Sequence, residues 1–530
     1  MKLVWLAAAL AFTTAAQTFT VSGTVLDGET HSPVARMRVV LSVSGQEQTA
    51  VTGADGRFSF EAPAGKLRLF VERQGWRQVY GEESSNNFGS SVITGPDQDT
   101  AHLVFVWHAP GVIFGKVIDD RGEPVASAQL QLIRTSVEGG RKRTRTAAWA
   151  NTDDLGNYRF QQLFAGTYYL AVSAEPWYDS FQRVPLLQSA ATSSVYAVAY
   201  YPNTTDPRGA APITVKSGVE VEANFTLRAV SGTNVHLSCT GSERCSGRVY
   251  FYADGIDGVE TLVKQTYAAV MHPEAAGSQP AQIIGGVPPG RYIVRFTGDG
   301  QSLRKVLDIA GAETTVDLTP QAMARFTGTL SFRNPSVKPR STVYVCLVNE
   351  ETAAAFLRAV EADGSFSFPN VVPAKYRAYI VGADGYFVSS LTAEGAEVRD
   401  GAIDVAEAAS IRLNIIASDE TGRLKGFVKD GDRAVPAVFV VLAPVKNSDD
   451  SSAYRLFQTD SDGSFDFLDV RAGDYYLVRV ESAQIEYANP AVIRPYLTEA
   501  KTVHIEAHHT SEQDLTIGPP APPAIPRPGA

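Results

Sequence analysis

One short phrase of sequence recurs along the chain and constrains its fold more than any other feature. Residues 459–467 read TDSDGSFDF, and residues 152–160 read TDDLGNYRF. Similar phrases lie near residues 56 and 364, and a weaker form precedes residues 289–292 (PGRY). A phrase that recurs at the spacing of a small domain is the signature of a repeated domain. The sequence therefore predicts a tandem array of about five similar units.

The phrase predicts a tight turn between two antiparallel β-strands. Gly463 follows Asp462, and this order favours a turn because glycine accepts a positive φ while the carboxylate accepts hydrogen bonds from nearby amides. After the turn, Phe465 and Phe467 alternate with polar residues, as in a strand with one buried and one solvated face. We therefore expect an all-β fold, and the only helix-like pattern after residue 16 lies near residues 353–361.

The residues that open each unit extend this pattern to a recognisable family. Residues 21–25 (VSGTV) precede a Pro-Val pair, and residues 115–125 and 426–437 repeat that arrangement. Together with the turn phrase, they resemble the carboxypeptidase regulatory-like domain. The resemblance implies a small seven-stranded antiparallel sandwich of the transthyretin-like or prealbumin-like type. Copy four departs from the family at Ala374, where the family has glycine, and copy three lacks the Asp-Gly turn.

The repeats divide the chain into predicted segments. Residues 1–16 combine a lysine, an apolar run and a small-residue end, which is the pattern of a cleaved secretory signal peptide. A proline-rich tail that is expected to be disordered closes the chain. Between these ends we expect sandwiches at residues 17–109, 110–230 with a long insertion, 231–320 in degenerate form, 321–418 and 419–517, with the tail at 518–530. Short joints between the units predict a semi-rigid string.

Charge and hydropathy narrow the expected location and partners. No run after residue 16 reaches the roughly 20 apolar residues that span a bilayer. We therefore expect an exported protein without a transmembrane segment, located in the periplasm, at the cell surface or in the medium. The net charge of −10 argues against a nucleic-acid partner. The expected partner is a polysaccharide or an envelope protein, and the sequence does not determine the oligomeric state.

The sequence lacks the motifs that usually carry catalysis. It contains no His-Glu-x-x-His helix, no Gly-x-Ser-x-Gly elbow and no phosphate-binding Gly-x-x-x-x-Gly-Lys loop. We therefore expect a non-enzymatic protein without a cofactor. A weak calcium candidate exists, because Asp460, Asp462 and Asp469 match positions three, five and twelve of a calcium-binding loop. Since Gln458 takes the first position and strands flank the segment, we interpret it as a structural turn.

The three cysteines give one candidate disulfide. Cys239 and Cys245 enclose a short loop, and export permits a bond between them. Two unpaired thiols are the alternative. Cys346 lies in an apolar strand and is expected to be a buried thiol.

Two further features allow both a functional and a structural interpretation. The basic stretch at residues 141–145 (RKRTR) is either a solvated hairpin tip or a binding site for an anionic polymer. Lys116 and Asn224 occupy suggestive positions for an isopeptide bond of the kind found in the similar Cna-B sandwiches. The other copies do not repeat that pair.

The distribution of aromatic residues gives the candidate binding site. Trp177, Tyr178, Tyr200 and Tyr201 crowd the insertion of copy two, and copies three to five contain no tryptophan. Flat aromatic rings beside polar groups suit the C–H faces of sugar rings. In the alternative interpretation, the tyrosines hold their own loop together, and the tryptophans at positions 76 and 107 complete sandwich cores.

Two function hypotheses follow from these features. In the first, the chain is an exported non-enzymatic binding or scaffold protein that presents its sandwiches to a carbohydrate or a protein. Families related to the one it resembles are described as carbohydrate-binding-like, which is an analogy of fold alone. In the second, it is a regulatory or assembly partner of an exported peptidase or an outer-membrane receptor, because family members occur fused to peptidases and barrels.

Overall fold

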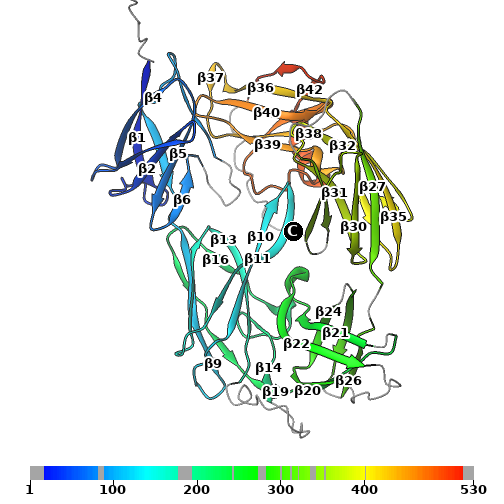
Figure 1. Ribbon diagram of the computed structural model, residues 1–530. Coiled ribbons are helices and arrows are strands. Elements are labelled where there is room, and N and C mark those ends of the chain that lie inside the picture. The colour runs from blue at the N-terminus through cyan, green and yellow to red at the C-terminus, as the bar shows by residue number, and fades with distance from the viewer. Residues whose placement is uncertain are drawn as a thin grey trace, which may run out of the picture.

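The computed structural model is a tandem array of small β-sandwiches (Figure 1). It describes residues 17–81, 89–176, 194–241, 244–271, 282–298, 301–310, 313–319, 322–334, 342–350, 352, 354–399 and 401–516. Within these ranges the chain is all-β apart from one four-residue α-helix and four short 3-10 helices. No helix in them is long and apolar enough to cross a lipid bilayer.

Sandwich 1 packs a sheet of order β4-β1-β8 against a sheet of order β3-β2-β5-β6, with β7 pairing β5. Phe58 and Phe60 point into its core and alternate with exposed residues, as the repeated phrase predicts. The strands are β1 (Thr18–Asp27), β2 (Arg38–Val43), β3 (Gln46–Val51), β4 (Arg57–Pro63), β5 (Gly65–Arg73), β6 (Trp76–Val79), β7 (Val92–Thr94) and β8 (Leu103–Trp107).

Sandwich 2 packs β11-β10-β13-β15 against β12-β9-β17, with β16 pairing β13 and β18 pairing β9. A separate two-stranded sheet joins β14 to β19. The elements are β9 (Gly111–Asp119), β10 (Gln129–Glu138), β11 (Arg141–Asn151), β12 (Asn157–Leu163), β13 (Gly166–Ser173), β14 (Ser194–Tyr196), β15 (Ala199–Tyr200), η1 (Pro207–Gly209), β16 (Ile213–Val215), β17 (Glu220–Glu222), β18 (Phe225–Leu227) and β19 (Ala229–Ser231).

Sandwich 3 packs β23-β20-β26 against β22-β21-β24-β25. Although its Asp-Gly turn is missing from the sequence, Val249, Phe251 and Tyr292 still form a buried core. The elements are β20 (Thr233–Ser238), β21 (Arg244–Ala253), η2 (Ile256–Gly258), β22 (Thr261–Met271), β23 (Gln282–Val287), β24 (Gly290–Gly298), β25 (Gln301–Ile309) and β26 (Thr314–Asp317).

Sandwich 4 packs β30-β27-β35-β32 against β29-β28-β31-β34-β33. Residues 353–361, which have a helix-like pattern in the sequence, instead contain strand β29, which pairs with β28. The strands are β27 (Ala324–Phe332), β28 (Tyr344–Asn349), β29 (Ala355–Ala359), β30 (Ser365–Val371), β31 (Lys375–Val381), β32 (Phe387–Glu394), β33 (Glu397–Arg399), β34 (Ala402–Asp404) and β35 (Ser410–Ser418).

Sandwich 5 packs β37-β36-β40, with β43 and β44 also pairing β36, against β39-β38-β41-β42. A short helical segment that the sequence did not predict leads from β41 into β42. The elements are β36 (Thr421–Asp430), β37 (Arg433–Ala434), β38 (Phe439–Pro444), η3 (Ser451–Ala453), β39 (Arg455–Gln458), β40 (Ser464–Arg471), β41 (Gly473–Val480), α1 (Pro490–Ile493), η4 (Arg494–Glu499), β42 (Lys501–Ile505), β43 (Thr510–Glu512) and β44 (Leu515–Thr516).

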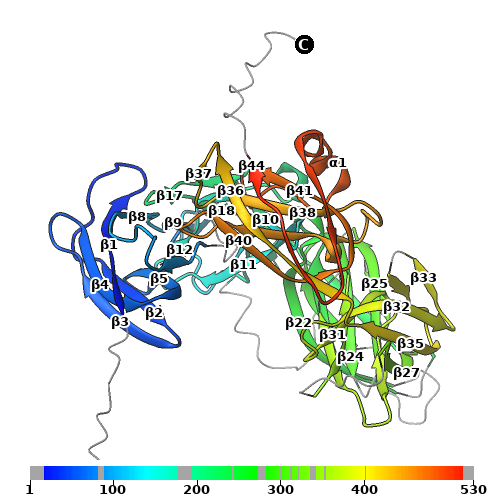
Figure 2. The ribbon, with the colours of Figure 1, turned by 90° about the horizontal axis from the view of Figure 1, so that it is seen from above.

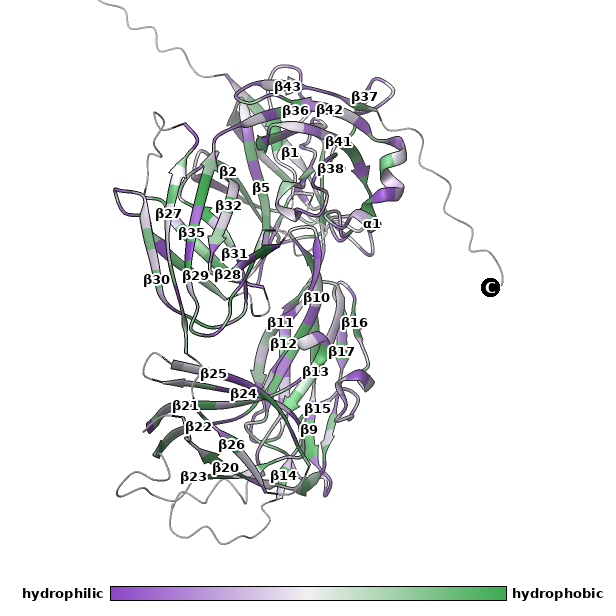
Figure 3. Ribbon diagram, turned by 90° about the vertical axis from the view of Figure 1, so that its right-hand side faces the viewer, coloured by the Kyte–Doolittle hydropathy of each residue, from purple (hydrophilic) through white to green (hydrophobic). Residues whose placement is uncertain are grey.

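Each sandwich combines antiparallel neighbours with parallel pairing of its first strand to one or two strands near the end of the unit. The pairs are β1 with β8, β9 with β17 and β18, β20 with β26, β27 with β35, and β36 with β43 and β44. The alternation of residues did not reveal this pairing, because it does not encode strand direction. Figure 3 shows hydrophobic and hydrophilic residues interleaved along the strands.

The predicted turn is confirmed in copies one, two, four and five, although copy two has a leucine between its aspartate and its glycine. Gly56, Gly156, Gly364 and Gly463 adopt φ values of 70°, 78°, 86° and 77°. A preceding carboxylate accepts a backbone N–H in each turn, as Asp462 Oδ1 does from Ser464 at 3.0 Å. The local sequence therefore determines the turn through a residue with a positive φ and an aspartate cap.

The arrangement of the sandwiches differs from the expected string. Sandwich 5 returns to contact sandwich 1, and the β10–β11 hairpin of sandwich 2 extends toward sandwich 5 (Figures 1 and 2). The semi-rigid string is therefore wrong in shape, although the tandem order of the units is right. Residues far apart in the sequence make these contacts, and short joints alone could not predict them.

Candidate functional site

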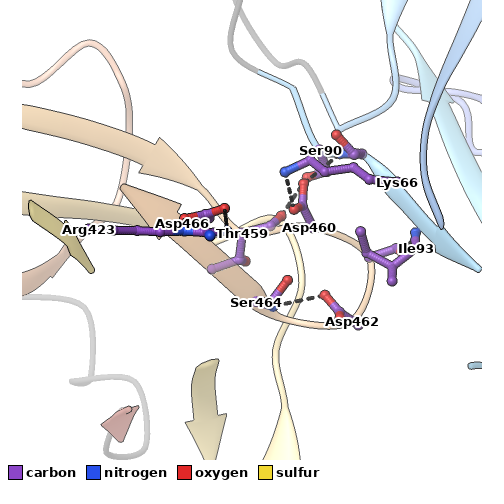
Figure 4. Close-up of polar contacts among 11 residues, drawn as sticks. Lys66, Ser90, Ile93, Arg423, Thr459, Asp460, Asp462, Ser464 and Asp466 are labelled. Atoms are coloured by element: carbon purple, nitrogen blue, oxygen red, sulfur yellow. Dashed lines mark hydrogen bonds and ion pairs between the residues drawn. The ribbon is translucent and has the colours of Figure 1, made fainter. Parts of the chain in front are cut away.

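The turn of the repeated phrase in sandwich 5 lies against sandwich 1 (Figure 4). Asp460 is 3% exposed. Its Oδ2 atom lies 2.6 Å from the Nζ of Lys66 on β5, and its Oδ1 accepts a hydrogen bond from the backbone N–H of Ser91 at 2.8 Å. The buried carboxylate therefore has both a charged partner and a backbone donor, as a buried charge requires.

Backbone hydrogen bonds extend this contact on both sides of Asp460. Ser90 Oγ donates to the carbonyl of Thr459 at 2.7 Å, and the Ile93 N–H donates to Ser461 Oγ at 2.9 Å. The Ser461 N–H donates back to the Ser91 carbonyl at 2.9 Å. We call this set of contacts the closing joint, because it joins the last sandwich to the first.

The closing joint accounts for the weak calcium candidate. Asp460 pairs with Lys66, Asp462 caps its own turn, and Asp469 lies within β40 where the strand register shifts, with φ 50°. Among the residues that the structure describes, no group of three His, Cys, Asp or Glu side chains gathers to hold a metal ion. The structure therefore does not bring Asp460, Asp462 and Asp469 together.

The β10–β11 hairpin makes a second contact with sandwich 5. Val137 packs in one apolar cluster with Tyr487, Ala488 and Ile493. The Ala488 N–H donates to the Gly140 carbonyl at 3.0 Å. Gly140 has φ 76°, and a Cβ there would lie 2.5 Å from the Cβ of Ala488, so the contact requires glycine.

The same hairpin also contacts sandwich 3. Gln131 is 1% exposed, accepts from Thr261 Oγ1 at 2.6 Å and donates to the Glu260 carbonyl at 3.1 Å. Thr144 Oγ1 donates to Asp257 Oδ2 at 3.0 Å. Residues 141–145 therefore begin a strand that contacts sandwich 3 through Thr144, while Lys142, Arg143 and Arg145 remain exposed.

The structure places the predicted aromatic site differently from the sequence interpretation. Tyr200 is 1% exposed and lies in an apolar cluster with Ile133 and Ile256, so its ring follows the structural alternative and is covered rather than open to a ligand. Burial raises the pKa of Tyr200 to about 12. Tyr201 is half-buried, with its ring 6.2 Å from that of Phe225. Trp177 and Tyr178 lie outside the described residues.

Two tryptophans follow the alternative, structural interpretation. Trp76 and Trp107 are buried in the core of sandwich 1. The Trp76 ring also lies 4.4 Å from the ring of Phe164 in sandwich 2. Trp76 therefore packs in the core of sandwich 1 and also contacts sandwich 2.

The remaining candidate residues have identifiable contacts. Cys239 and Cys245 form a disulfide with a Cα–Cα distance of 5.9 Å, and Cys346 is a buried thiol. Asn224 Oδ1 accepts from the backbone N–H of Lys116 at 2.8 Å, and its Nδ2 donates to Glu222 at 2.8 Å. The amide that an isopeptide bond would use is thus engaged by the Lys116 backbone and by Glu222.

A cleft of 720 Å³ opens beside the hairpin, between sandwiches 2 and 5. The Arg134 guanidinium lies 5.9 Å from the ring centre of Phe164 and 5.5 Å from that of Tyr168. Tyr487 of sandwich 5 lines the opposite side. The other lining residues belong to sandwich 2, and no sequence signal indicated this cleft.

Comparisons with known proteins find one family model. Residues 20–97 and 112–228, which lie in sandwiches 1 and 2, match the family model described as the carboxypeptidase regulatory-like domain. No curated protein sequence matches the chain.

Three solved structures that are similar to the chain share 13% identity with it or less. The Bacillus anthracis TIE protein is 13% identical with a TM-score of 0.15, and the match covers 72% of this chain and 65% of that protein. The Streptococcal ancillary pilin is 11% identical (54% and 98% covered, TM-score 0.19). Two B repeat units of the collagen binding protein of Staphylococcus aureus are 10% identical (76% and 100% covered, TM-score 0.13).

Proposed function

Because the chain carries carboxypeptidase regulatory-like domains, we propose that it is an exported, non-enzymatic binding and scaffold protein. Its sandwiches hold one another in a fixed arrangement and display their outer sheet faces to an envelope polysaccharide. The signal-like residues 1–16 support export to the periplasm, the cell surface or the medium.

The observation that carries this proposal is the use of turn and hairpin residues as joints. Asp460 pairs with Lys66 across the closing joint, and Gln131 is buried against sandwich 3. The hydrogen-bonding groups of these polar side chains find their partners across the contacts between sandwiches. A protein whose loops are engaged in this way offers its sheet faces, rather than its loops, to a partner.

An envelope protein is the second candidate partner, as for a regulatory or assembly subunit of an exported peptidase or outer-membrane receptor. The outer face of sandwich 4 favours it, because Tyr344, Leu357, Tyr379 and Val381 are 37%, 45%, 40% and 43% exposed there. Register pairs place Tyr344 opposite Val381, so these side chains are contiguous. Contiguous exposed apolar residues usually mark a surface that contacts another protein.

Binding of the full mature chain to purified envelope fractions tests both candidates. The immobilised protein is exposed in parallel to polysaccharide and protein fractions from the same envelope. Retention of polysaccharide supports the first candidate. Protein retention that L357S/V381S abolishes supports the second candidate. The control is V51S/V104S, which alters two valines of sandwich 1 that are more exposed still, and it should leave that retention intact. Retention of neither fraction contradicts the proposed function.

A further inference from the structure

The outer face of one sheet in sandwich 3 combines arginines and tyrosines. In the sheet β22-β21-β24-β25 (Figure 3), Val249 and Phe251 point into the core. Strand residues alternate between faces, so Arg248, Tyr250 and Tyr252 share the opposite, outer face. Their neighbours on that face follow from the strand register.

The register assembles these residues into adjacent rows. Tyr250 pairs with Gln265 on one side and with Arg295 on the other, and Arg295 pairs with Arg304. In the next row, Arg248 pairs with Tyr267, which is 60% exposed. Each of these three arginines and three tyrosines therefore has another of the set as its cross-strand partner or two residues away on the same strand.

Two half-buried tyrosine rings lie nearly parallel to each other. The rings of Tyr250 and Tyr252 are 6.0 Å apart and inclined by only 22°. The Arg295 guanidinium lies 5.5 Å from the Tyr252 ring centre and pairs with Glu260 at 2.7 Å, which fixes its position. Adjacent parallel rings of this kind offer stacking surface to a planar or ring-shaped ligand.

Two of the arginines carry charge that the described residues do not neutralise. Arg248 and Arg304 are exposed, and neither forms an ion pair within the ranges that the structure describes. The whole chain has a net charge of −10. A local surplus of cations on an acidic protein favours an anionic partner, and arginine binds carboxylates through two parallel hydrogen bonds.

We propose that this face, defined by Arg248, Tyr250, Tyr252, Tyr267, Arg295 and Arg304, binds an acidic polysaccharide with uronic-acid carboxylates. Sugar rings stack on the tyrosines, and the carboxylates pair with Arg248 and Arg304. The inference rests on the polysaccharide form of the proposed function. It places the contact in sandwich 3, whereas the sequence pointed to residues 177, 178, 200 and 201 in copy two.

The test measures binding of the full mature chain to polygalacturonic acid, with dextran as a neutral polymer and single-stranded DNA as an anionic polymer with stacking bases. The wild-type protein is expected to bind polygalacturonic acid in preference to both, and more weakly as salt screens the charges. R248Q/R304Q and Y250L/Y252L are each expected to weaken binding by roughly tenfold, as for loss of a charge pair or a stacking partner. Thermal melting confirms that each variant is folded.

The matched control is R325Q/R412Q, which removes two exposed arginines from sandwich 4 and so causes the same change in net charge. It is expected to bind like the wild type. If R248Q/R304Q and R325Q/R412Q weaken binding equally, or if R248Q/R304Q does not weaken it, the proposed face is overturned. The scaffold function would still stand. Preference for dextran or DNA overturns it as well. Failure to bind any polysaccharide or envelope protein contradicts the proposed function itself.

Discussion

At the scale of single residues, identical turn positions perform different tasks in different repeats. Asp460 and Asp153 both precede the turn glycine by three residues. In each turn the aspartate N–H donates to the carbonyl of the residue four positions later. Asp153 accepts from the amides of Leu155 and Asn157 within its own turn. Asp460 instead faces Lys66 of another sandwich. The sequence could predict the turn at both sites, but it could not predict a partner 394 residues away.

The first prediction concerns Asp460. The D460A substitution leaves the Ser91 N–H without its acceptor and Lys66 without its partner, so we expect a loss of about 1–3 kcal/mol from the closing joint. Because Lys66 is 49% exposed, most of that loss comes from the buried acceptor rather than from the ion pair. Limited proteolysis should then release sandwich 1 faster than in the wild type. D153A is the control, and equal release by both variants would count against the joint.

The second prediction concerns Gly463, whose φ of 77° and close neighbours both exclude a side chain. A Cβ there would lie 2.8 Å from the N atom of Val435. We expect G463V to lower the free energy of unfolding by roughly 1–3 kcal/mol, because a β-branched residue is strained at positive φ. Urea denaturation measures the change. G95V is the control, since Gly95 has ordinary φ and its nearest neighbour is 3.8 Å away; an equal loss there would refute the explanation.

At the scale of elements, the sequence predicted strands well and their surroundings poorly. The alternation of Phe465 and Phe467 is local, so it identified β40 and its buried face. The basic β11 strand had an equally clear pattern, yet that pattern did not reveal the contacts of Thr144 with sandwich 3 and of Arg141 with sandwich 5. Tyr200 was misplaced for the same reason, because Ile256 of sandwich 3 helps to cover it.

The third prediction tests the contact of the hairpin with sandwich 5. Gly139 and Gly140 are neighbours in one turn, with φ of 54° and 76°. G140A adds a Cβ that collides with Ala488, whereas G139A adds one with nothing within 4 Å. Both substitutions strain the turn, so the strain cancels in the comparison. Because only G140A also collides with Ala488, we expect it to lower the free energy of unfolding by about 1–3 kcal/mol more than G139A does, the usual cost of overpacking. Hydrogen exchange at the Ala488 amide should rise only in G140A, and unchanged exchange would contradict the contact.

The fourth prediction concerns pH and the η3 segment. Burial alone would raise the pKa of Asp450, but hydrogen bonds from Ser452 and the ion pair with Arg471 outweigh it and lower the pKa below 3.8. A lowered folded-state pKa stabilises the fold above the unfolded value, and that stability disappears as the pH falls through the folded value. We expect wild-type stability to fall progressively below about pH 4. D450N should lose less stability over that interval, and an identical pH profile would contradict this assignment.

At the scale of the whole molecule, the central claim is that the last sandwich closes on the first. The family resemblance predicted the repeated unit, and the short joints favoured a string. The closing joint, the buried Gln131 and the Trp76–Phe164 contact instead tie neighbouring and distant units together. Such contacts depend on surfaces from two repeats at once, which no pattern within one repeat can reveal.

Small-angle X-ray scattering of the mature chain tests this claim most directly. Five units of about 100 residues, each roughly 34 Å across, would give a radius of gyration near 50 Å if they stood in a row. The closed arrangement predicts a value below about 35 Å, since a fully compact chain of this length would have about 23 Å. The account predicts that the wild-type protein falls in the lower range and that D460A shifts toward larger values. A wild-type value near 50 Å would contradict it.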